Sequence, residues 1–316
     1  MTESEMRMDQ TLRKKHGSPR ASRCQPERRG SVFGLSTGAF HRVSYVDWGP
    51  IDDETPVVCV HGLTRQGRDF DHLAADLRSR GRRVVCPDLP GRGRSQWLVD
   101  PDDYALPQYC ADMNALIARL DVSQVDWVGT SLGGLIGIIL AGMPGSPIRR
   151  LVVNDIGPYV ASIGLVRIGH YLREMPESFP TFDEAEAYFR EILAPYGDLT
   201  DAQWRLITEH SVRWDEEQSA FLMLCDKNIG KAFRNSWFAS LNIWKYWDDI
   251  CVPTLILHGV QSDLLTRQLT DEMTSRNANA RVVRFEECGH VPPLFERHQI
   301  KVVRDFLTNG RTPPPD

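Results

Sequence analysis

The sequence lacks the features that would direct the protein to a membrane or to nucleic acid. No apolar run approaches the roughly 18 to 20 residues that a membrane-spanning helix needs. The formal net charge of -5 gives no reason to expect nucleic acid or an anionic membrane surface as a partner. We therefore expect a small-molecule substrate, and the composition leaves open whether the chain is a monomer or a homodimer.

The sequence also lacks the spacings that mark a metal site. Neither Cys-x-x-Cys nor His-Glu-x-x-His occurs, so no dedicated zinc site is expected. The seven cysteines are scattered, and Cys59, Cys86 and Cys251 lie in or beside apolar, strand-like runs. Buried free thiols explain this pattern better than a disulfide framework does, which predicts a reducing, cytoplasmic location.

Both ends of the chain lack hydrophobic periodicity. Residues 1–35 are polar and rich in arginine, but they also carry acidic residues and no apolar signal core follows them. We predict a disordered basic leader over residues 1–35 and a disordered tail over residues 310–316, where three consecutive prolines stand.

Strand-like and helix-like segments alternate through most of the remaining chain. Strands are predicted at 40–47, 57–60, 84–86, 125–128, 151–153, 254–257 and 281–285, and a closing helix at about 300–307. Apolar residues at helical spacing separate the strands. This alternation predicts an α/β fold with a mostly parallel, doubly wound sheet, whose core comprises residues 36–158 and 248–309.

Residues 159–247 interrupt this alternation after the strand predicted at 151–153. They show helical patterns without a strong strand, and Thr181 and Thr200 each open a capping box. The segment is rich in aromatic residues. We predict a helical lid, with Trp237, Trp244 and Trp247 as candidates for the substrate pocket.

The motif Gly129-Thr130-Ser131-Leu132-Gly133 stands between a predicted strand and an apolar, helix-compatible segment. A strand that turns directly into a helix forces the residue at the turn into a strained backbone conformation. Small neighbours are needed there, which explains Gly129 and Gly133. The arrangement exposes the Ser131 hydroxyl at the carboxyl edge of the sheet as a candidate nucleophile.

A serine nucleophile needs a base and an acid that orients the base. In a parallel sheet both must lie on loops at the carboxyl ends of strands. His290 follows the last predicted strand and is the candidate base. Asp263 follows the strand before it and is the candidate acid, with Asp155, just after an earlier strand, as the alternative.

The developing oxyanion needs two backbone amides. The amide of Leu132, which directly follows the nucleophile, is one candidate. The other is expected in His61-Gly62-Leu63-Thr64, directly after a buried strand, where Leu63 is preferred and Gly62 is the fallback. Arg65, the next residue, is a candidate contact for an acidic substrate group, although a solvated arginine at a helix start is an equal alternative.

Taken together, the chain resembles the α/β-hydrolase superfamily over residues 36–309, specifically its lidded serine esterase, lactonase and C–C hydrolase branch. The resemblance rests on motifs in the expected order: His61-Gly62, Asp88-x-x-Gly91-x-Gly93-x-Ser95, Gly129-x-Ser131-x-Gly133, Asp263 and Gly289-His290. It implies a catalytic triad of serine, acid and histidine. It also implies a structural role for His61, which would hold the oxyanion loop through its side chain.

The resemblance implies hydrolysis of a small or medium carboxylic ester or lactone through an acyl-enzyme, without metal or organic cofactor. A C–C bond hydrolase or a cofactor-free haloperoxidase would use the same triad, and both remain alternatives. The C–C hydrolases are expected to carry a tryptophan just after the histidine, where this chain has Val291. A ligand receptor on a hydrolase scaffold is the non-enzymatic alternative.

Overall fold

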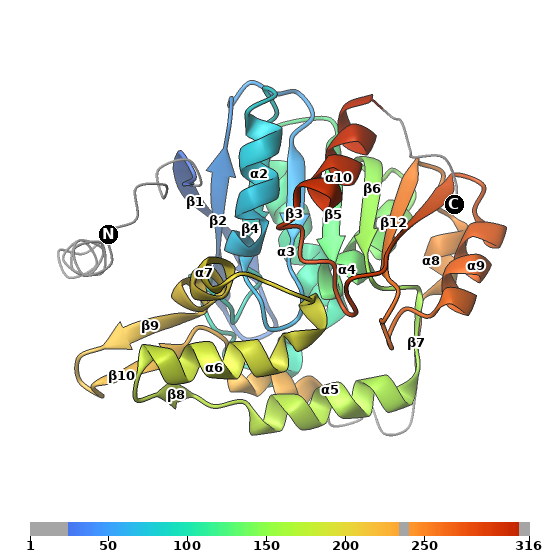
Figure 1. The fold of residues 1–316 in the computed structure, drawn as a ribbon. Helices are drawn as coiled ribbons and strands as arrows, with labels where there is room; N and C mark the ends of the chain where they lie inside the picture. The colour runs from blue at the N-terminus through green and yellow to red at the C-terminus, as the bar shows by residue number, and fades with distance from the viewer. Residues whose placement is uncertain (1–24, 234–239, 310–316) are drawn as a thin grey trace.

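The computed structural model describes residues 25–233 and 240–309, and its centre is an eight-stranded sheet (Figure 1). The strands lie in the order β1-β2-β4-β3-β5-β6-β12-β13. Their bounds are β1 Arg28–Leu35, β2 Phe40–Trp48, β3 Val57–Val60, β4 Val84–Pro87, β5 Val125–Thr130, β6 Ile148–Asn154, β12 Thr254–Gly259 and β13 Ala280–Phe285. From β4 to β13 all neighbours are parallel, whereas β1 and β2 form an antiparallel edge.

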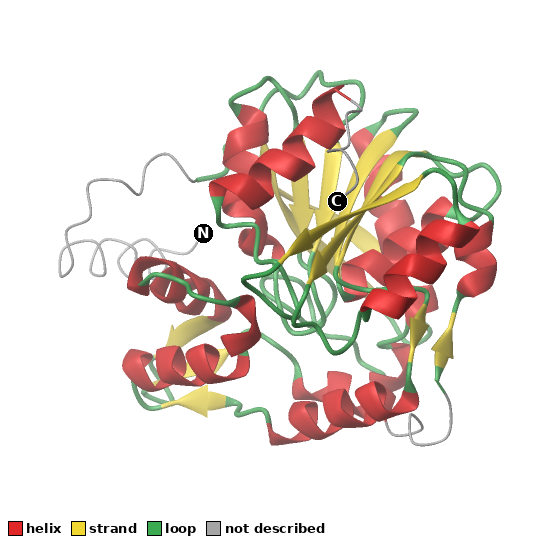
Figure 2. Ribbon diagram, turned by 45° about the vertical axis from the view of Figure 1, so that its right-hand side comes forward, coloured by secondary structure: helices red, strands yellow, loops and turns green. Residues whose placement is uncertain are grey.

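Helices cover both faces of this sheet, as the sequence predicts for a doubly wound fold (Figure 2). On one face lie α2 and α10, and on the other lie α3, α4, α8 and α9. Their bounds are α2 Asp71–Arg78, α3 Leu106–Leu120, α4 Leu132–Ala141, α8 Trp244–Asp248, α9 Arg267–Arg276 and α10 Arg297–Asn309. No helix within the described ranges is both long and apolar enough to cross a membrane.

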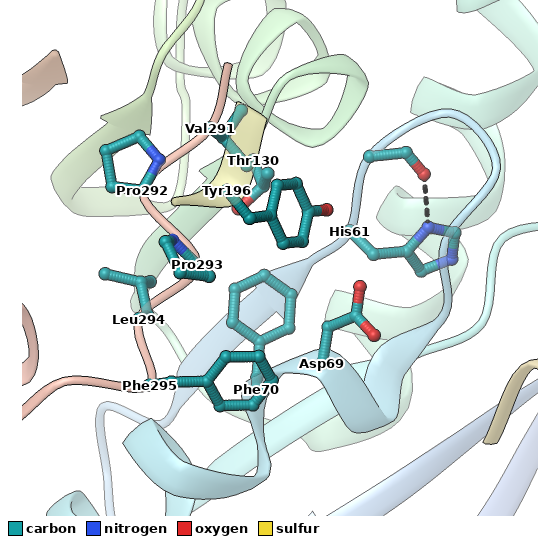
Figure 3. Close-up of a pocket in the computed structure, with 11 residues that line it drawn as sticks. His61, Asp69, Phe70, Thr130, Tyr196, Val291, Pro292, Pro293, Leu294 and Phe295 are labelled. Atoms are coloured by element: carbon teal, nitrogen blue, oxygen red, sulfur yellow. Dashed lines mark hydrogen bonds between the residues drawn. The ribbon is translucent and has the colours of Figure 1, made fainter. Parts of the chain in front are cut away.

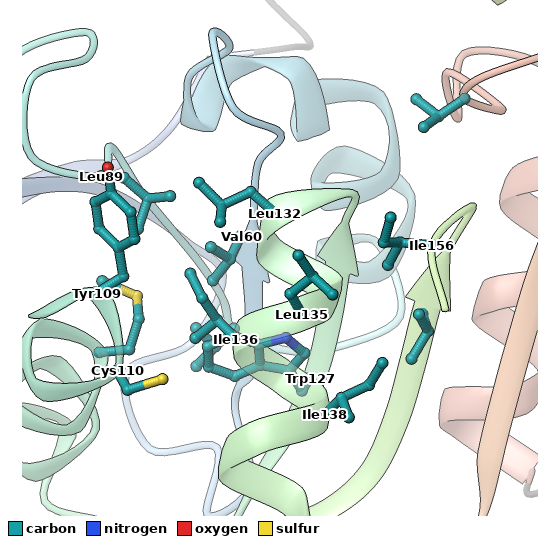
Figure 4. Close-up of a cluster of buried hydrophobic side chains, with 14 of the residues drawn as sticks. Val60, Leu89, Tyr109, Cys110, Trp127, Leu132, Leu135, Ile136, Ile138 and Ile156 are labelled. Atoms are coloured by element: carbon teal, nitrogen blue, oxygen red, sulfur yellow. The ribbon is translucent and has the colours of Figure 1, made fainter. Parts of the chain in front are cut away.

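The central helix α4 follows β5 directly and is buried along nearly its whole length. It is apolar on all sides, which is typical of a helix enclosed in a core. Ile136 and Ile138 of α4 pack in the same cluster as Trp127 of β5 (Figure 4). The Trp127 Nε1–H donates to the Gly133 carbonyl at 3.0 Å, so the strand and helix are also joined by a polar contact. The β5–α4 unit is therefore a rigid base for the turn at Ser131.

The predicted leader is wrong for residues 28–35, because these residues form β1. They pair with β2 along the whole strand, and Arg28 makes an ion pair with Asp47. Only Val32 supplies a large apolar side chain to the core from this strand. Backbone pairing and one ion pair hold β1, and neither gives hydrophobic periodicity in the sequence. The rest of the predicted leader before residue 25 and the predicted tail lie outside the described residues.

Residues 159–233 and 240–243, called the lid here, lie across the carboxyl edge of the sheet (Figure 1). The predicted lid extends to residue 247, but α8 packs on α4 at the face of the sheet, and residues 234–239 lie outside the described ranges. The lid contains α5 Ser162–Glu174, α6 Phe182–Ile192 and α7 Asp201–Ser211, followed by a 3-10 helix at Lys227–Phe233. The predicted capping box at Thr200 is confirmed, since its side chain accepts from the Gln203 amide and the Gln203 side chain accepts from the Thr200 amide. At Thr181 only half of the predicted box forms, because its side chain accepts from the Glu184 amide but the Glu184 side chain accepts from its hydroxyl and not from its amide.

The prediction of an entirely helical lid is wrong. A three-stranded antiparallel sheet lies beside the lid helices, formed by β8 Ser178–Phe179, β9 Val212–Asp215 and β10 Ala220–Met223. A further pair, β7 Tyr159–Val160 and β11 Leu241–Asn242, closes the base of the lid. These strands have two to four residues each, which is too short for alternation to distinguish them from loops.

Close contact between backbones at the start of α4 gives a test of the fold. A Cβ atom on Gly133 would lie 2.0 Å from the Val60 carbonyl oxygen, whereas one on Gly38 would come no closer than 3.9 Å to its neighbour. Gly133→Ala should lower the free energy of unfolding by about 3 kcal/mol through overpacking. Gly38→Ala, the control, should change it by less than about 0.5 kcal/mol. Urea unfolding measures both, and equal losses would contradict the proposed contact.

Candidate active site

Ser131 occupies the turn between β5 and α4, as predicted. Its backbone has φ 50° and ψ -111°, which is a strained conformation for a residue with a side chain. The Ser131 amide donates to the Asn154 carbonyl at 2.9 Å, and its own carbonyl accepts from the Gly134 and Leu135 amides. These bonds hold the turn from both sides, so the hydroxyl is presented at the carboxyl edge of the sheet.

His290 lies on the loop after β13 and reaches Ser131. Its Nε2 is 3.0 Å from the Ser131 Oγ, and its Nδ1 is 2.8 Å from Oδ2 of Asp155. A carboxylate can only accept a hydrogen bond, so Nδ1 carries the proton and Nε2 is free to accept from the serine hydroxyl. The histidine side chain is 22% exposed and the aspartate is fully buried. The three residues therefore form a chain of hydrogen bonds that runs from the buried sheet edge to the serine.

The acid in this chain is Asp155, the residue directly after β6. Its Oδ1 accepts from the Gly259 amide at 2.8 Å, and its Oδ2 accepts from the Ser262 hydroxyl at 2.5 Å as well as from His290. Donors from two separate segments, the end of β12 and the His290 loop, thus converge on one buried carboxylate. These donors fix the orientation of the carboxylate toward His290.

The prediction that Asp263 pairs with His290 is wrong in the structure, and the alternative Asp155 takes that position. The Asp263 side chain is 55% exposed and forms an ion pair with Arg167 of α5. This arginine holds the pKa of Asp263 below its ordinary value. The physical reason is topological. Because β6 neighbours the nucleophile strand β5, the residue after β6 lies next to the serine, while the segment after β12 places Ser262 there.

Two residues that the sequence reasoning missed support this arrangement. Ser262 donates to Asp155, as described above. Asn154 donates from Nδ2 to the Thr130 hydroxyl at 3.1 Å and to the Pro292 carbonyl at 2.9 Å, and so ties the nucleophile strand to the histidine loop. The adjacent pair of Asn and Asp directly after a fully buried strand was the signal that could have indicated both Asn154 and Asp155.

The loop His61–Thr64, called the oxyanion loop here, lies beside the nucleophile. A Cβ atom on Gly62 would be 3.7 Å from the Cβ of Ser131. Among the described residues, the Leu63 amide donates to no carbonyl. Leu132 opens α4, and the first amides of a helix have no intrahelical acceptor. Both candidate amides are therefore available to a substrate oxygen.

The buried His61 side chain fixes the conformation of the oxyanion loop through two hydrogen bonds. The Gly62 carbonyl can only accept, so His61 donates to it from Nδ1 at 2.6 Å (Figure 3). Nε2 is then unprotonated and accepts from the Leu89 amide at 2.8 Å. Burial lowers the pKa of His61 to about 3, with smaller contributions from Arg92 and Arg65. The ring is therefore neutral near pH 7 and fixes both the loop and the neighbouring chain segment.

Arg65 does not lie free for an acidic substrate group. It is buried, donates to both carboxylate oxygens of Asp69, and reaches the hydroxyl of Ser211 at the end of α7 at 3.0 Å. Its guanidinium also lies 5.6 Å from the ring centroid of Phe189 in α6. Arg65 therefore connects the oxyanion loop to the lid, and the candidate substrate role is not supported.

The tryptophans proposed for the pocket are not brought to the serine either. Trp247 is fully buried and donates to the Met273 carbonyl, and the ring of Trp244 is covered by Arg276 at 4.1 Å. Their helix, α8, packs against the carboxyl end of α4 at Gly142, roughly 15 Å along that helix from Ser131. Trp237 lies outside the described residues.

One hollow borders the site, and a second, larger one is lined by none of Ser131, His290 and Asp155. The smaller, of about 20 Å³, has room for about one water molecule. It is lined by His61, Gly62, Asp69, Phe70, Thr130, Tyr196 and residues 291–295 (Figure 3). The larger is an open groove of about 550 Å³ between the amino-terminal part of α5 and the segment from Asp263 to Glu272. Only the groove is large enough for an organic substrate.

Comparison with known proteins identifies the class to which this fold and site belong. The model of the alpha/beta hydrolase family matches residues 57–304. The chain therefore belongs to the α/β hydrolase family.

Three known proteins are similar to this chain over most of its length. The 3-hydroxybutyrate-oligomer hydrolase of Cupriavidus necator is 41% identical over 290 residues, which cover 90% of this chain and 98% of that protein. An α/β hydrolase of Novosphingobium aromaticivorans has a TM-score of 0.79 at 30% identity, covering 90% of this chain and 99% of that one. A hydrolase of Rickettsia typhi has a TM-score of 0.81 at 27% identity, covering 89% and 98%. The chain is therefore an enzyme, a hydrolase of the α/β family.

The buried, neutral state of His61 predicts an acid-sensitive contribution to stability. Between the ordinary histidine pKa of about 6.5 and the folded value of about 3, the unfolded chain binds a proton that the folded chain does not. The free energy of unfolding should therefore fall as pH falls below 6.5, by roughly 1.4 kcal/mol per pH unit from this residue. His61→Gln should remove that part of the slope.

Urea unfolding of both proteins at pH 7, 6 and 5 measures this effect. The advantage of the wild type over His61→Gln should be constant above pH 7 and should shrink below pH 6.5. Parallel stability curves over this range would contradict a buried neutral His61.

Proposed function

We propose that the protein is a serine hydrolase that cleaves small or medium carboxylic esters through an acyl-enzyme. Ser131 is the nucleophile, His290 the general base and Asp155 the acid that orients it. The observation that carries this proposal is the hydrogen-bonded chain in which His290 lies 3.0 Å from the Ser131 Oγ and 2.8 Å from Asp155. This is the separation at which a base can take the serine proton.

Acylation begins when the Ser131 oxygen attacks the ester carbonyl and its proton passes to Nε2 of His290. The carbonyl electrons move to its oxygen, and the amides of Leu63 and Leu132 donate to the resulting oxyanion. The tetrahedral intermediate then collapses. The carbonyl re-forms, the bond to the alcohol oxygen breaks, and His290 returns its proton to that oxygen. Asp155 stabilises the imidazolium while it exists and keeps Nδ1 as the protonated nitrogen.

Deacylation repeats these steps with water as the nucleophile. His290 takes a proton from the water, whose oxygen attacks the acyl carbonyl, and the oxyanion again lies against the two amides. Collapse breaks the bond to Ser131, and the histidine gives the proton back to the serine oxygen. The products are one carboxylic acid and one alcohol, and the enzyme returns to its starting protonation state.

For the substrate, we propose short oligomers of a 3-hydroxy acid. The Cupriavidus relative matches nearly its full length at 41% identity. The groove of about 550 Å³ is lined by no triad residue but includes Asp263, next to Ser262, which contacts Asp155, so it would hold the part of a longer substrate that extends away from Ser131. Its walls carry apolar side chains such as Leu264 and Leu269 together with polar ones, which suits a chain of alternating methylene and ester groups.

The triad assignment predicts that Asp155→Asn lowers kcat by about 10⁴-fold, because the amide would stabilise the wrong tautomer of His290. The kcat of Asp263→Asn should stay within about tenfold of the wild-type value, because this substitution removes only an exposed ion pair. Turnover of p-nitrophenyl butyrate measures both, and Ser131→Ala sets the background. The melting temperature of each variant controls for misfolding. A large loss in Asp263→Asn with little loss in Asp155→Asn would refute the assignment.

The substrate assignment predicts that 3-hydroxybutyrate dimers and trimers are cleaved with a kcat/KM at least tenfold above that of p-nitrophenyl butyrate. Leu264→Trp should narrow the groove and raise KM for the trimer several-fold, while KM for p-nitrophenyl acetate stays unchanged. Leu264→Met is the volume-matched control. Release of 3-hydroxybutyrate is the readout. Turnover of simple esters without turnover of the oligomers would reject the substrate but keep the mechanism, and turnover of vinylogous diketones alone would favour C–C hydrolysis.

A further inference from the structure

Arg92 is a fully buried arginine beside the oxyanion loop. It lies in the loop after β4 and is 0% exposed. Its Nε donates to the Leu63 carbonyl at 2.7 Å, and its Nη1 donates to the Pro90 carbonyl at 2.6 Å and to the Tyr109 hydroxyl at 2.8 Å. The side chain thus contacts the residue whose amide is assigned to the oxyanion.

Arg92 makes no direct ion pair within the residues that the structure describes. Its hydrogen bonds go to neutral oxygens, Nη2 is buried without an acceptor, and the rings of Tyr104 and Tyr109 lie 5.7 and 5.0 Å from the guanidinium. The buried Asp226 carboxylate is linked to it only through Tyr104, whose hydroxyl donates to Asp226 at 2.6 Å. The buried Arg65 and Arg83, in contrast, each pair directly with an aspartate. A buried cation without a direct ion pair is costly, so a purely structural role does not account for it well.

We propose that Arg92 is a positioning residue of the oxyanion hole, acting through the Leu63 carbonyl and through its buried charge. This inference rests on the mechanism proposed above. The Leu63 N–H lies in the same peptide plane as the Gly62 carbonyl, which His61 holds, and Arg92 holds the next peptide plane through the Leu63 carbonyl. With the planes on both sides of the Leu63 Cα fixed, the direction of the Leu63 N–H is set before substrate binds, which avoids reorganisation during the reaction.

The charge of Arg92 adds an effect that is specific to the intermediate. The substrate carbonyl is neutral, whereas the oxyanion that forms against the Leu63 amide carries a full negative charge. The buried Arg92 cation contacts the carbonyl of the same residue, Leu63, and its charge is weakly screened. It therefore stabilises the charged intermediate more than the bound substrate. Loss of Arg92 should accordingly lower kcat far more than it raises KM.

The loop that carries Arg92 is also clamped by the lid. The Gly93 amide donates to the Leu224 carbonyl at 2.9 Å, and the Asp226 amide donates to the Gly91 carbonyl at 2.8 Å, so the lid segment 224–226 pairs with both neighbours of Arg92. The lid segment 224–226 thus contacts the loop of Arg92, and Arg92 in turn contacts the Leu63 carbonyl. The position of this lid segment therefore contributes to the geometry of the oxyanion hole.

The test compares Arg92→Met and Arg92→Lys with the control Arg83→Met. Arg83 is also a buried arginine, but its side chain contacts Asp47 and the Ile51 carbonyl. For each protein, kcat and KM for p-nitrophenyl butyrate are measured with the inhibition constant of phenylboronic acid, whose tetrahedral adduct on Ser131 mimics the intermediate. Arg92→Met should lower kcat by about 10²-fold and weaken the boronic acid by a similar factor, with KM changed less than about threefold. The kcat and the boronic acid affinity of Arg92→Lys should lie between those of Arg92→Met and the wild type. Arg83→Met should change neither kcat nor boronic acid affinity.

Three results would overturn the inference. One is a kcat of Arg92→Met within about threefold of the wild type. The second is a loss of kcat without weaker boronic acid binding, and the third is an equal loss of kcat in Arg83→Met, since either would show a general structural effect. If Arg92→Met does not fold, Arg92→Lys carries the test, with a loss of at least fivefold in both kcat and boronic acid affinity expected. A wild type that boronic acid does not inhibit, or an active Ser131→Ala, would instead reject the proposed function.

Discussion

The structure of the site depends on one buried carboxylate, that of Asp155. It stands at the end of β6, fully buried, and accepts from the Gly259 amide, the Ser262 hydroxyl and Nδ1 of His290. Removal of such an acceptor would leave several buried donors unpaired, each at a cost of about 1–3 kcal/mol. The same carboxylate therefore joins β6, β12 and the loop after β13, and sets the direction in which the histidine points. The chemistry proposed for Ser131 follows from that direction.

The second part of the site, the oxyanion loop, is organised on a different principle. Its peptide groups are held by buried side chains, the neutral His61 and Arg92, which makes no direct ion pair within the described residues. Arg65, the residue directly after this loop, pairs with Asp69 and reaches the lid. The Thr64 hydroxyl accepts from Tyr171 of α5 at 3.4 Å, and the chain around Arg92 pairs with the lid segment 224–226. The lid therefore contacts the loop that carries the proposed oxyanion hole.

Local signals in the sequence were sufficient for the sheet, the turn at Ser131 and the position of His290 after the last strand, because strand periodicity and the glycine motif are short-range features. They were not sufficient to choose between Asp155 and Asp263, since both follow strands and only the strand order places one next to the serine. The edge strand β1 was missed because backbone pairing holds it, with few apolar contacts. The role of Arg92 was not predicted either, because a buried arginine without a direct ion pair is recognised only when its surroundings are known.

The most direct test of this account is a crystal structure of the enzyme with a phosphonate bound to the Ser131 Oγ. The account predicts that one phosphonyl oxygen accepts hydrogen bonds from the Leu63 and Leu132 amides, that Asp155 holds Nδ1 of His290, and that Arg92 remains on the Leu63 carbonyl. A histidine turned to Asp263, or a phosphonyl oxygen bound to neither amide, would contradict the account.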